Sequence, residues 1–147
     1  MASLSPLLSL AHLVGLSLSI GAATVKLALL LRCRDDQTFI PVFVRVARPV
    51  TRLIILGLIL LTVSGVVWLV RGYPWTPLLV VKLVLVAAVW VIGPVIDNVV
   101  EPRIQKLAPG PGDQLLPAFR DVLKQYLRLE VVATLLFYVV TVVWVWR

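Results

Sequence analysis

Two residues of this chain could ligate a metal from within an apolar segment, His12 and Lys82. His12 is the only histidine, and both residues are surrounded in sequence by Leu, Val and Ala. Imidazole is a strong ligand for iron, and a lysine withdrawn from water can lose its proton and offer a neutral amine. The chemistry open to this pair is therefore axial ligation of a metal or a porphyrin, provided that the fold brings them together.

The elements that must position these residues are membrane-spanning helices. Hydrophobic residues make up 61% of the 147-residue chain and the mean hydropathy is +1.03, which leaves too little polar surface for a water-soluble globule. Four apolar stretches approach or exceed the roughly 20 residues of a spanning helix, without the alternation of barrel strands. They lie at 6–31, 52–70, 77–96 and 129–146. We expect an all-α integral membrane four-helix bundle, with 1–147 as a single transmembrane domain.

Basic residues are concentrated in two of the three connections. Connections 32–51 and 97–128 hold most of the Lys and Arg, whereas the connection between the second and third spans holds only Arg71. Because basic residues beside spans stay on the cytoplasmic side, we expect both connections in the cytoplasm and an N-out/C-out orientation. The net charge of +7 flanks apolar spans, which indicates contact with membrane lipid and argues against nucleic acid.

Aromatic and small residues support the same arrangement. Trp and Tyr side chains gather at the expected outer ends, where amphipathic rings prefer to lie: Trp68, Tyr73, Trp75, Trp144 and Trp146. Small residues recur every four positions in the first span and allow close helix packing: Ala11, Gly15, Ser19 and Ala23. The second helix is expected to start near Thr51, and the short turn 71–77 predicts that the second and third helices are antiparallel neighbours. Gly93 and Pro94 predict a kink in the third.

The helical rise places His12 and Lys82 at similar depths. At about 1.5 Å per residue, His12 lies roughly 10 Å and Lys82 roughly 8 Å from the outer ends of their spans. The first and third spans run in the same direction, so both side chains can reach one ligand in the outer half. Two structural alternatives remain open. Lys82 can extend its ammonium to the interface, and His12 can hydrogen-bond to Ser9, Ser64 or a carbonyl on a neighbouring helix.

Other polar residues near the spans have simpler expected roles. Lys26, one turn from the cytoplasmic end of its span, is expected to extend its charge to the interface. Asp97 and Glu130 are expected to form ion pairs at the membrane boundary rather than a proton route. Their expected partners are Arg48, Arg52 or Arg128. A transporter would need a polar path across both leaflets, and beyond His12, Lys82 and a few hydroxyls the spans offer none.

Several short motifs resemble one known family. They are Ala11-His12-Leu13-Val14-Gly15-Leu16 with Gly21, Arg48-Pro49-Val50-Thr51-Arg52, Ser64-Gly65, and Trp75 followed by Val81-Lys82-Leu83-Val84-Leu85. This pattern covers about two thirds of the chain. It resembles the small four-helix membrane proteins related to the HemJ-type protoporphyrinogen oxidase and to the membrane domain of CopD copper-resistance proteins.

The resemblance implies b-type haem, with His12 and Lys82 in the roles of the family's first-helix histidine and third-helix lysine. It also implies a bacterial plasma membrane. In the HemJ-type proteins the histidine is followed by a tryptophan-glycine element and an Arg-Leu-Phe-Val-Tyr-His-like segment. In this chain residues 17–31 instead contain small residues and a Lys-Leu-Ala-Leu run. Haem binding can therefore be retained without protoporphyrinogen oxidation. A CopD-like copper role lacks soft ligands, because the chain has one histidine, one cysteine and one methionine.

The leading hypothesis is a haem b protein with a redox or electron-transfer role. It leaves open whether the chain is a haem-dependent oxidoreductase. It also leaves open which residues would be catalytic. His12 binds the iron, and Lys82 is the opposing ligand or a nearby polar partner. Gly15 and Gly65 make room for the porphyrin, and Arg71 contacts its propionates unless it is only an interfacial anchor. The main alternative is a non-enzymatic accessory or scaffold subunit of a larger membrane complex. A homodimer is also possible, and a small transporter ranks below these.

Overall fold

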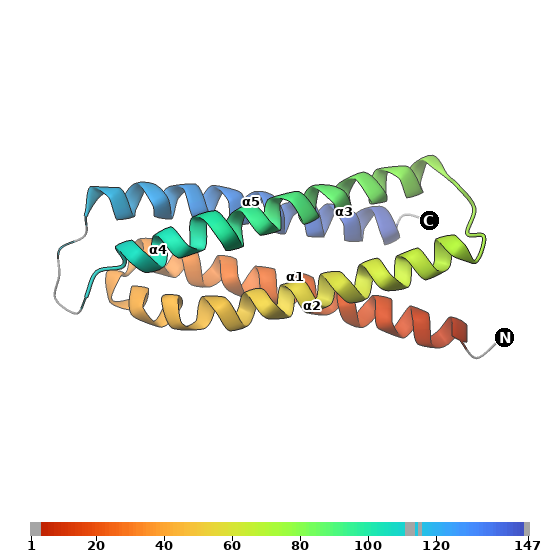
Figure 1. The fold of residues 1–147 in the computed structure, drawn as a ribbon, viewed down its shortest axis with the longest axis horizontal. Helices are drawn as coiled ribbons and strands as arrows, with labels where there is room; N and C mark the ends of the chain where they lie inside the picture. Colours follow the sequence, from red (N-terminus) through yellow and green to blue (C-terminus); the bar gives the residue numbers. More distant parts are fainter. Residues whose placement is uncertain (1–3, 111–113, 115, 146–147) are drawn as a thin grey trace.

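The computed structural model describes residues 4–110, 114 and 116–145, which contain helices and turns and no strand. In chain order the elements are α1 (Leu4–Asp35), the 3-10 turn η1 (Gln37–Phe39), α2 (Ile40–Val70), α3 (Pro77–Val95), the π-helical turn η2 (Ile96–Val100), α4 (Glu101–Leu107) and α5 (Pro117–Val145) (Figure 1). Four helical stretches in these residues are long and apolar enough to cross a membrane. The all-α membrane bundle is therefore confirmed.

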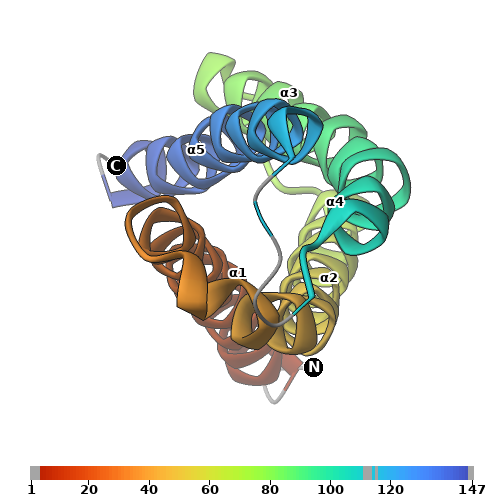
Figure 2. The same ribbon diagram turned by 90° about the vertical axis from the view of Figure 1, so that its left-hand side faces the viewer.

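The helices form two pairs. α1 packs along α2, α3 packs on α5, and contacts between α1 and α5 join the pairs. Seen from the end, α1 and α2 lie opposite α3 and α5 (Figure 2). α2 and α3 run antiparallel, as expected, and a hydrogen bond between Trp90 and Thr62 joins them, but their backbones approach less closely than those within each pair. Thr76 accepts a hydrogen bond from the Leu79 amide and so caps α3 after the turn.

Two glycines bring the backbones of α1 and α2 into contact. A Cβ built on Gly57 would lie 2.6 Å from the Gly15 carbonyl oxygen and 2.8 Å from the Ser19 amide nitrogen. A Cβ on Gly15 would lie 2.7 Å from the Gly57 carbonyl oxygen. Real side chains do not fit at such distances, so the predicted small-residue ladder of the first span does pack against another backbone.

The start of the second helix differs from the start expected from the sequence. α2 begins at Ile40 rather than near Thr51, and it continues through Pro49. The physical reason is an apolar stripe at helical spacing, since Phe43, Ala47 and Val50 are buried on one face of this segment. Helix also extends through much of connections 32–51 and 97–128, and the charged segment before the last span is continuous with it in α5, as its amphipathic pattern predicts. The last span was expected to end at residue 146, which lies outside the described residues. The side chains of Trp144 and Trp146 also lie outside them.

The expected kink at Gly93 and Pro94 takes the form of a wider helical turn. The chain continues as helix beyond Pro94 and passes through η2, where the Glu101 amide bonds to the Ile96 carbonyl five residues earlier. Pro94 and Pro102 both lack the amide that an α-helix would need here, and a π-turn accommodates such losses. Asp97 and Glu101 lie four residues apart, share one helix face and both face Lys26 of α1, which matters for the site below.

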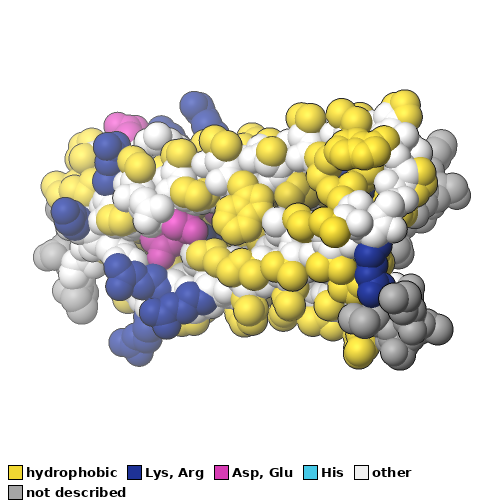
Figure 3. Space-filling model, turned by 45° about the vertical axis from the view of Figure 1, so that its right-hand side comes forward, with side chains coloured by type: hydrophobic (Ala, Val, Ile, Leu, Met, Phe, Trp, Pro, Cys, Tyr) yellow, Lys and Arg dark blue, Asp and Glu magenta, His cyan; other side chains and the backbone are white. Residues whose placement is uncertain are grey.

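Packing is tightest at the end where α1 finishes and α5 begins. Tyr126, Phe43, Leu30, Ile104 and Phe119 are each at most 1% exposed in one continuous core. A smaller cluster in the middle of the bundle contains Ala23, Leu58, Val89 and Phe137. Lys and Arg side chains gather at the tightly packed end, beyond a wide hydrophobic belt (Figure 3). The opposite half of the bundle is more open and contains a cavity.

Candidate functional site

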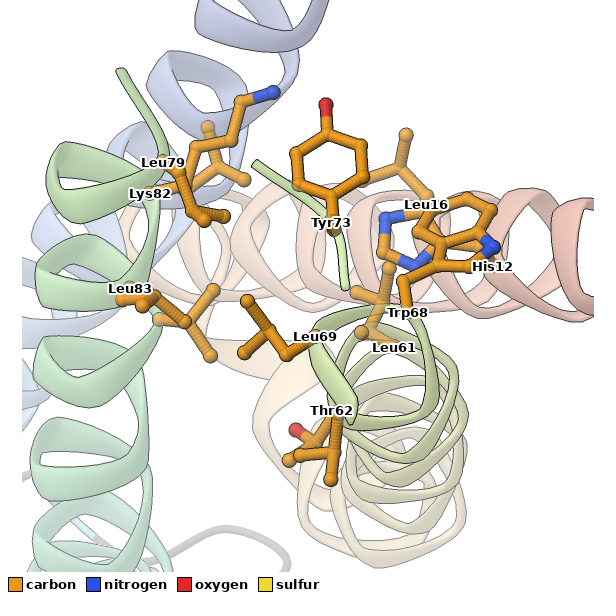
Figure 4. Close-up of a pocket in the computed structure, with 14 residues that line it drawn as sticks. His12, Leu16, Leu61, Thr62, Trp68, Leu69, Tyr73, Leu79, Lys82 and Leu83 are labelled. Carbon is orange, nitrogen blue, oxygen red and sulfur yellow. The ribbon is translucent and has the colours of Figure 1, made fainter. Parts of the chain in front are cut away.

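The open half of the bundle contains a cavity of about 150 Å³ between α2 and α3. His12 of α1 and Lys82 of α3 both line it, together with Gly65, Trp68 and Tyr73. Figure 4 shows His12 and Lys82 on opposite walls, with Tyr73 in the turn above them. The two residues singled out by depth in the sequence are thus placed around the same space. We call this space the outer cavity.

The hydrogen bond of His12 fixes which ring nitrogen carries the proton. His12 Nδ1 lies 2.8 Å from Ser64 Oγ, and Ser64 Oγ donates its single hydrogen to the Leu60 carbonyl at 2.6 Å. The hydroxyl therefore accepts from Nδ1–H, and Nε2 keeps its lone pair. The Trp68 ring packs on the imidazole, with ring centroids 5.0 Å apart. The hydrogen bond and the ring contact hold His12 in one orientation at the cavity wall, and the tautomer with Nδ1–H leaves Nε2 as the nitrogen that could ligate a metal.

The other predicted site residues lie in different surroundings. Gly65 is in the cavity wall, and a Cβ there would meet no atom within 4 Å. Gly15 instead lies in the contact between α1 and α2. Arg71 is exposed at the end of α2 and does not line the cavity. Of the two glycines, only Gly65 is placed where it leaves room for a ligand.

The structure overturns the expectation that Lys26 extends its charge to the interface. The residue is 1% exposed, and its ammonium donates to Thr51 Oγ1 at 2.6 Å. Three carboxylates surround it, with Nζ–O distances of 3.5 Å to Glu101, 3.7 Å to Asp97 and 3.8 Å to Glu130. We call these residues, with Thr51 and Tyr126, the Lys26 cluster.

The expected arginine partners of Asp97 and Glu130 are wrong for the same reason. Both carboxylates turn inward to Lys26, and Glu101, which the sequence did not single out, accepts hydrogen bonds from Thr51 and Tyr126. The depth argument used for His12 could have found this cluster. Lys26 and Asp97 each lie about 30 Å from the start of their parallel spans at 1.5 Å per residue, so they reach one level.

A second cavity, of about 210 Å³, lies beside the Lys26 cluster. Its polar lining comes from Lys26, Thr51, Asp97, Asn98 and Glu130. We call it the inner cavity. Between it and the outer cavity, Trp90 Nε1 of α3 donates to Thr62 Oγ1 of α2 at 3.0 Å. This hydrogen bond joins α2 and α3 at a point between the two cavities.

Comparisons of the chain with protein-family models, with curated proteins and with solved structures find no match. Within the described residues, no group of three His, Cys, Asp or Glu side chains is placed to hold a metal ion. The chemistry of the site therefore has to be argued from His12, the outer cavity and the Lys26 cluster themselves.

Proposed function

We propose that this chain is a membrane haem b-binding protein with a redox or electron-transfer role, in which His12 supplies an axial ligand. The observation that carries the proposal is the imidazole at the wall of the outer cavity, with Nδ1 hydrogen-bonded to Ser64. Metal-ligating histidines characteristically donate their other ring N–H in this way. Porphyrin brings its own four nitrogens, so a single protein imidazole is a sufficient anchor.

The donor set fits haem better than the present size of the cavity does. At about 150 Å³ the outer cavity is smaller than the roughly 300–1,000 Å³ of typical ligand pockets, so it admits part of a porphyrin. The cavity can widen by separating α2 from α3, which leaves the glycine contact between α1 and α2 and the packing of α3 on α5 in place. Gly65 adds open space at this wall.

Other residues near the outer cavity have roles that follow from their charge. Lys82, on the wall opposite His12, is the second ligand or a polar partner, and Arg71 at the outer end of α2 suits propionates. Bound haem would supply one-electron redox chemistry, and the protein would tune it through the ligands and their burial.

We also propose an N-out/C-out orientation in a bacterial plasma membrane, with connections 32–51 and 97–128 cytoplasmic. α1 begins and α5 ends at the same end of the bundle. The basic side chains gather at the other end, as expected of cytoplasmic connections.

An absorption spectrum of the detergent-purified protein, oxidised and dithionite-reduced, tests the proposal. We expect a Soret band that is lost in His12→Ala, because no other histidine can replace the ligand. A change of spin state in Lys82→Ala would identify the second ligand. A wild-type protein that stays colourless after haem is supplied would overturn the proposal and favour an accessory subunit that needs no cofactor.

Ser64→Ala should weaken haem binding about 10–100-fold, since removal of a hydrogen-bond partner behind a ligating histidine has effects of this size. The alanine leaves Nδ1 without its acceptor, so the ring can rotate and change tautomer. Haem affinity by titration and the midpoint potential are the measurements. Ser17→Ala, on an exposed face of the same span as His12, is the matched control. Equal affinities for the two variants would show that Ser64 does not hold the ligand.

A further inference from the structure

The Lys26 cluster contains more acid than base. One ammonium faces three carboxylates, contributed by η2, α4 and α5. The side chains of Lys26, Glu130 and Glu101 are only 2%, 3% and 6% exposed, and Asp97 is 22% exposed. With every group ionised the cluster would carry a charge of about −2, and an uncompensated buried charge costs several kcal/mol per ion. The cluster therefore favours retaining a proton.

The surroundings of the three carboxylates differ. Glu101 accepts hydrogen bonds from Thr51 and Tyr126 on one oxygen and from Gln105 on the other, all of which favour its ionised form. Asp97 is partly exposed, so solvent can stabilise its charge. From α2, the neighbouring Arg48 and Arg52 are exposed on the outside of the bundle, so Lys26 is the base that faces the cluster.

Glu130 has the least support as an anion. Its Oε2 is buried and has no hydrogen-bond partner among the described residues, and the same holds for Oγ1 of Thr134, one turn further along α5. Buried polar atoms are rarely left in this state. A proton on Glu130 would remove its buried negative charge and would let the carboxyl group donate to a water in the inner cavity.

We propose that the Lys26 cluster is a proton-binding site, in which Glu130 holds the proton at neutral pH and exchanges it with water in the inner cavity. In this step a hydronium ion that reaches the inner cavity from bulk solvent gives one proton to a Glu130 carboxylate oxygen and remains as water, so no electrons are transferred. At about 210 Å³ the inner cavity has room for several waters, each occupying about 30 Å³ in the liquid. Asp97 and Asn98 line this cavity, and partly exposed Asp97 gives water a route to the cluster.

Infrared spectroscopy of the full chain in detergent or lipid tests the proposal directly. A protonated carboxyl has a C=O stretch that is separate from the carboxylate bands and shifts in D₂O. We expect this band at neutral pH in the wild type and its loss in Glu130→Gln. The band should diminish as the pH is raised. Asp97→Asn removes a neighbouring negative charge, so the band should diminish at a lower pH in that variant and persist in acidic buffer. Absence of the band at neutral pH, or its persistence in Glu130→Gln, would overturn the proposal.

Thermal unfolding of the same variants separates proton binding from a purely structural ion pair. Glutamine resembles protonated glutamate, so Glu130→Gln should unfold at nearly the wild-type temperature. Glu101→Gln removes an ionised partner of Lys26 and should be clearly less stable. If Glu130→Gln is destabilised as much as Glu101→Gln, Glu130 is an ionised partner of Lys26 and the proposal fails. This test does not require that the protein bind haem.

Discussion

Lys26→Met should lower the free energy of unfolding by roughly 3–5 kcal/mol, the range found when one member of a buried ion pair is removed. Methionine fills a similar volume and so isolates the loss of the ammonium. Without it, Glu101 and Asp97 face each other across a buried space with no base between them. The measurement is equilibrium or thermal unfolding in a mild detergent.

The pH dependence of this loss has a definite sign. In the variant the remaining carboxylates bind protons more readily in the folded state than in the unfolded state, so the variant gains stability as the pH falls. The deficit relative to wild type should therefore be larger in mildly alkaline than in mildly acidic buffer. Adding Glu101→Gln should recover part of it, because the two residues are coupled.

Lys124→Met is the matched control for Lys26→Met, because Lys124 is exposed on α5 at the same end of the bundle. Its effect should stay within about 0.5 kcal/mol, as for most surface substitutions. Equal effects at the two positions would contradict the buried ion pairs of Lys26.

Gly57→Ala should destabilise the bundle by about 1–3 kcal/mol, the usual range for overpacking. The new methyl group would be forced against Ser19 Oγ and the Gly15 carbonyl, and the backbone atoms among these contacts cannot move without separating α1 from α2. The measurement is again unfolding in detergent.

Gly21→Ala provides the comparison for Gly57→Ala, since a Cβ on Gly21 would meet no atom within 4 Å. Alanine there should be neutral or slightly stabilising, because it favours helix more than glycine does. A Gly57→Ala protein as stable as Gly21→Ala would show that α1 and α2 do not pack through these glycines.

The fold class could be predicted from the sequence because it depends on composition and length alone. Four long apolar stretches leave helices as the only spanning structure for such a chain. The expected start of the second helix near Thr51 was wrong, because the buried stripe of Phe43, Ala47 and Val50 continues the helix across Pro49. The short turn predicted that α2 and α3 are antiparallel, but it did not show that α1 with α2 and α3 with α5 are the closer pairs, because a turn limits the distance between two helix ends and not how the rest of each helix packs.

The candidate site was predicted only in part, because the position of a residue along a helix does not fix the direction of its side chain around the helix axis. Depth along a helix places His12 and Lys82 at one level, and the structure does put both around the outer cavity. Depth alone does not show which way a side chain faces, so Lys26 was assigned to the interface although it turns inward. Asp97 and Glu101 lie four residues apart and so share one helix face, but the kink predicted at Gly93 and Pro94 did not show which way that face turns.

The distance between α2 and α3 determines whether a ligand reaches the outer cavity from the lipid or from water. Val66 and Leu83 line this cavity and are also exposed on the side of the bundle, where acyl chains would surround them. A solute dissolved in the lipid can therefore reach the cavity from this side. Occupancy then depends on the amount of solute per lipid or detergent molecule. At fixed protein and ligand concentrations, adding more lipid or detergent should empty the cavity.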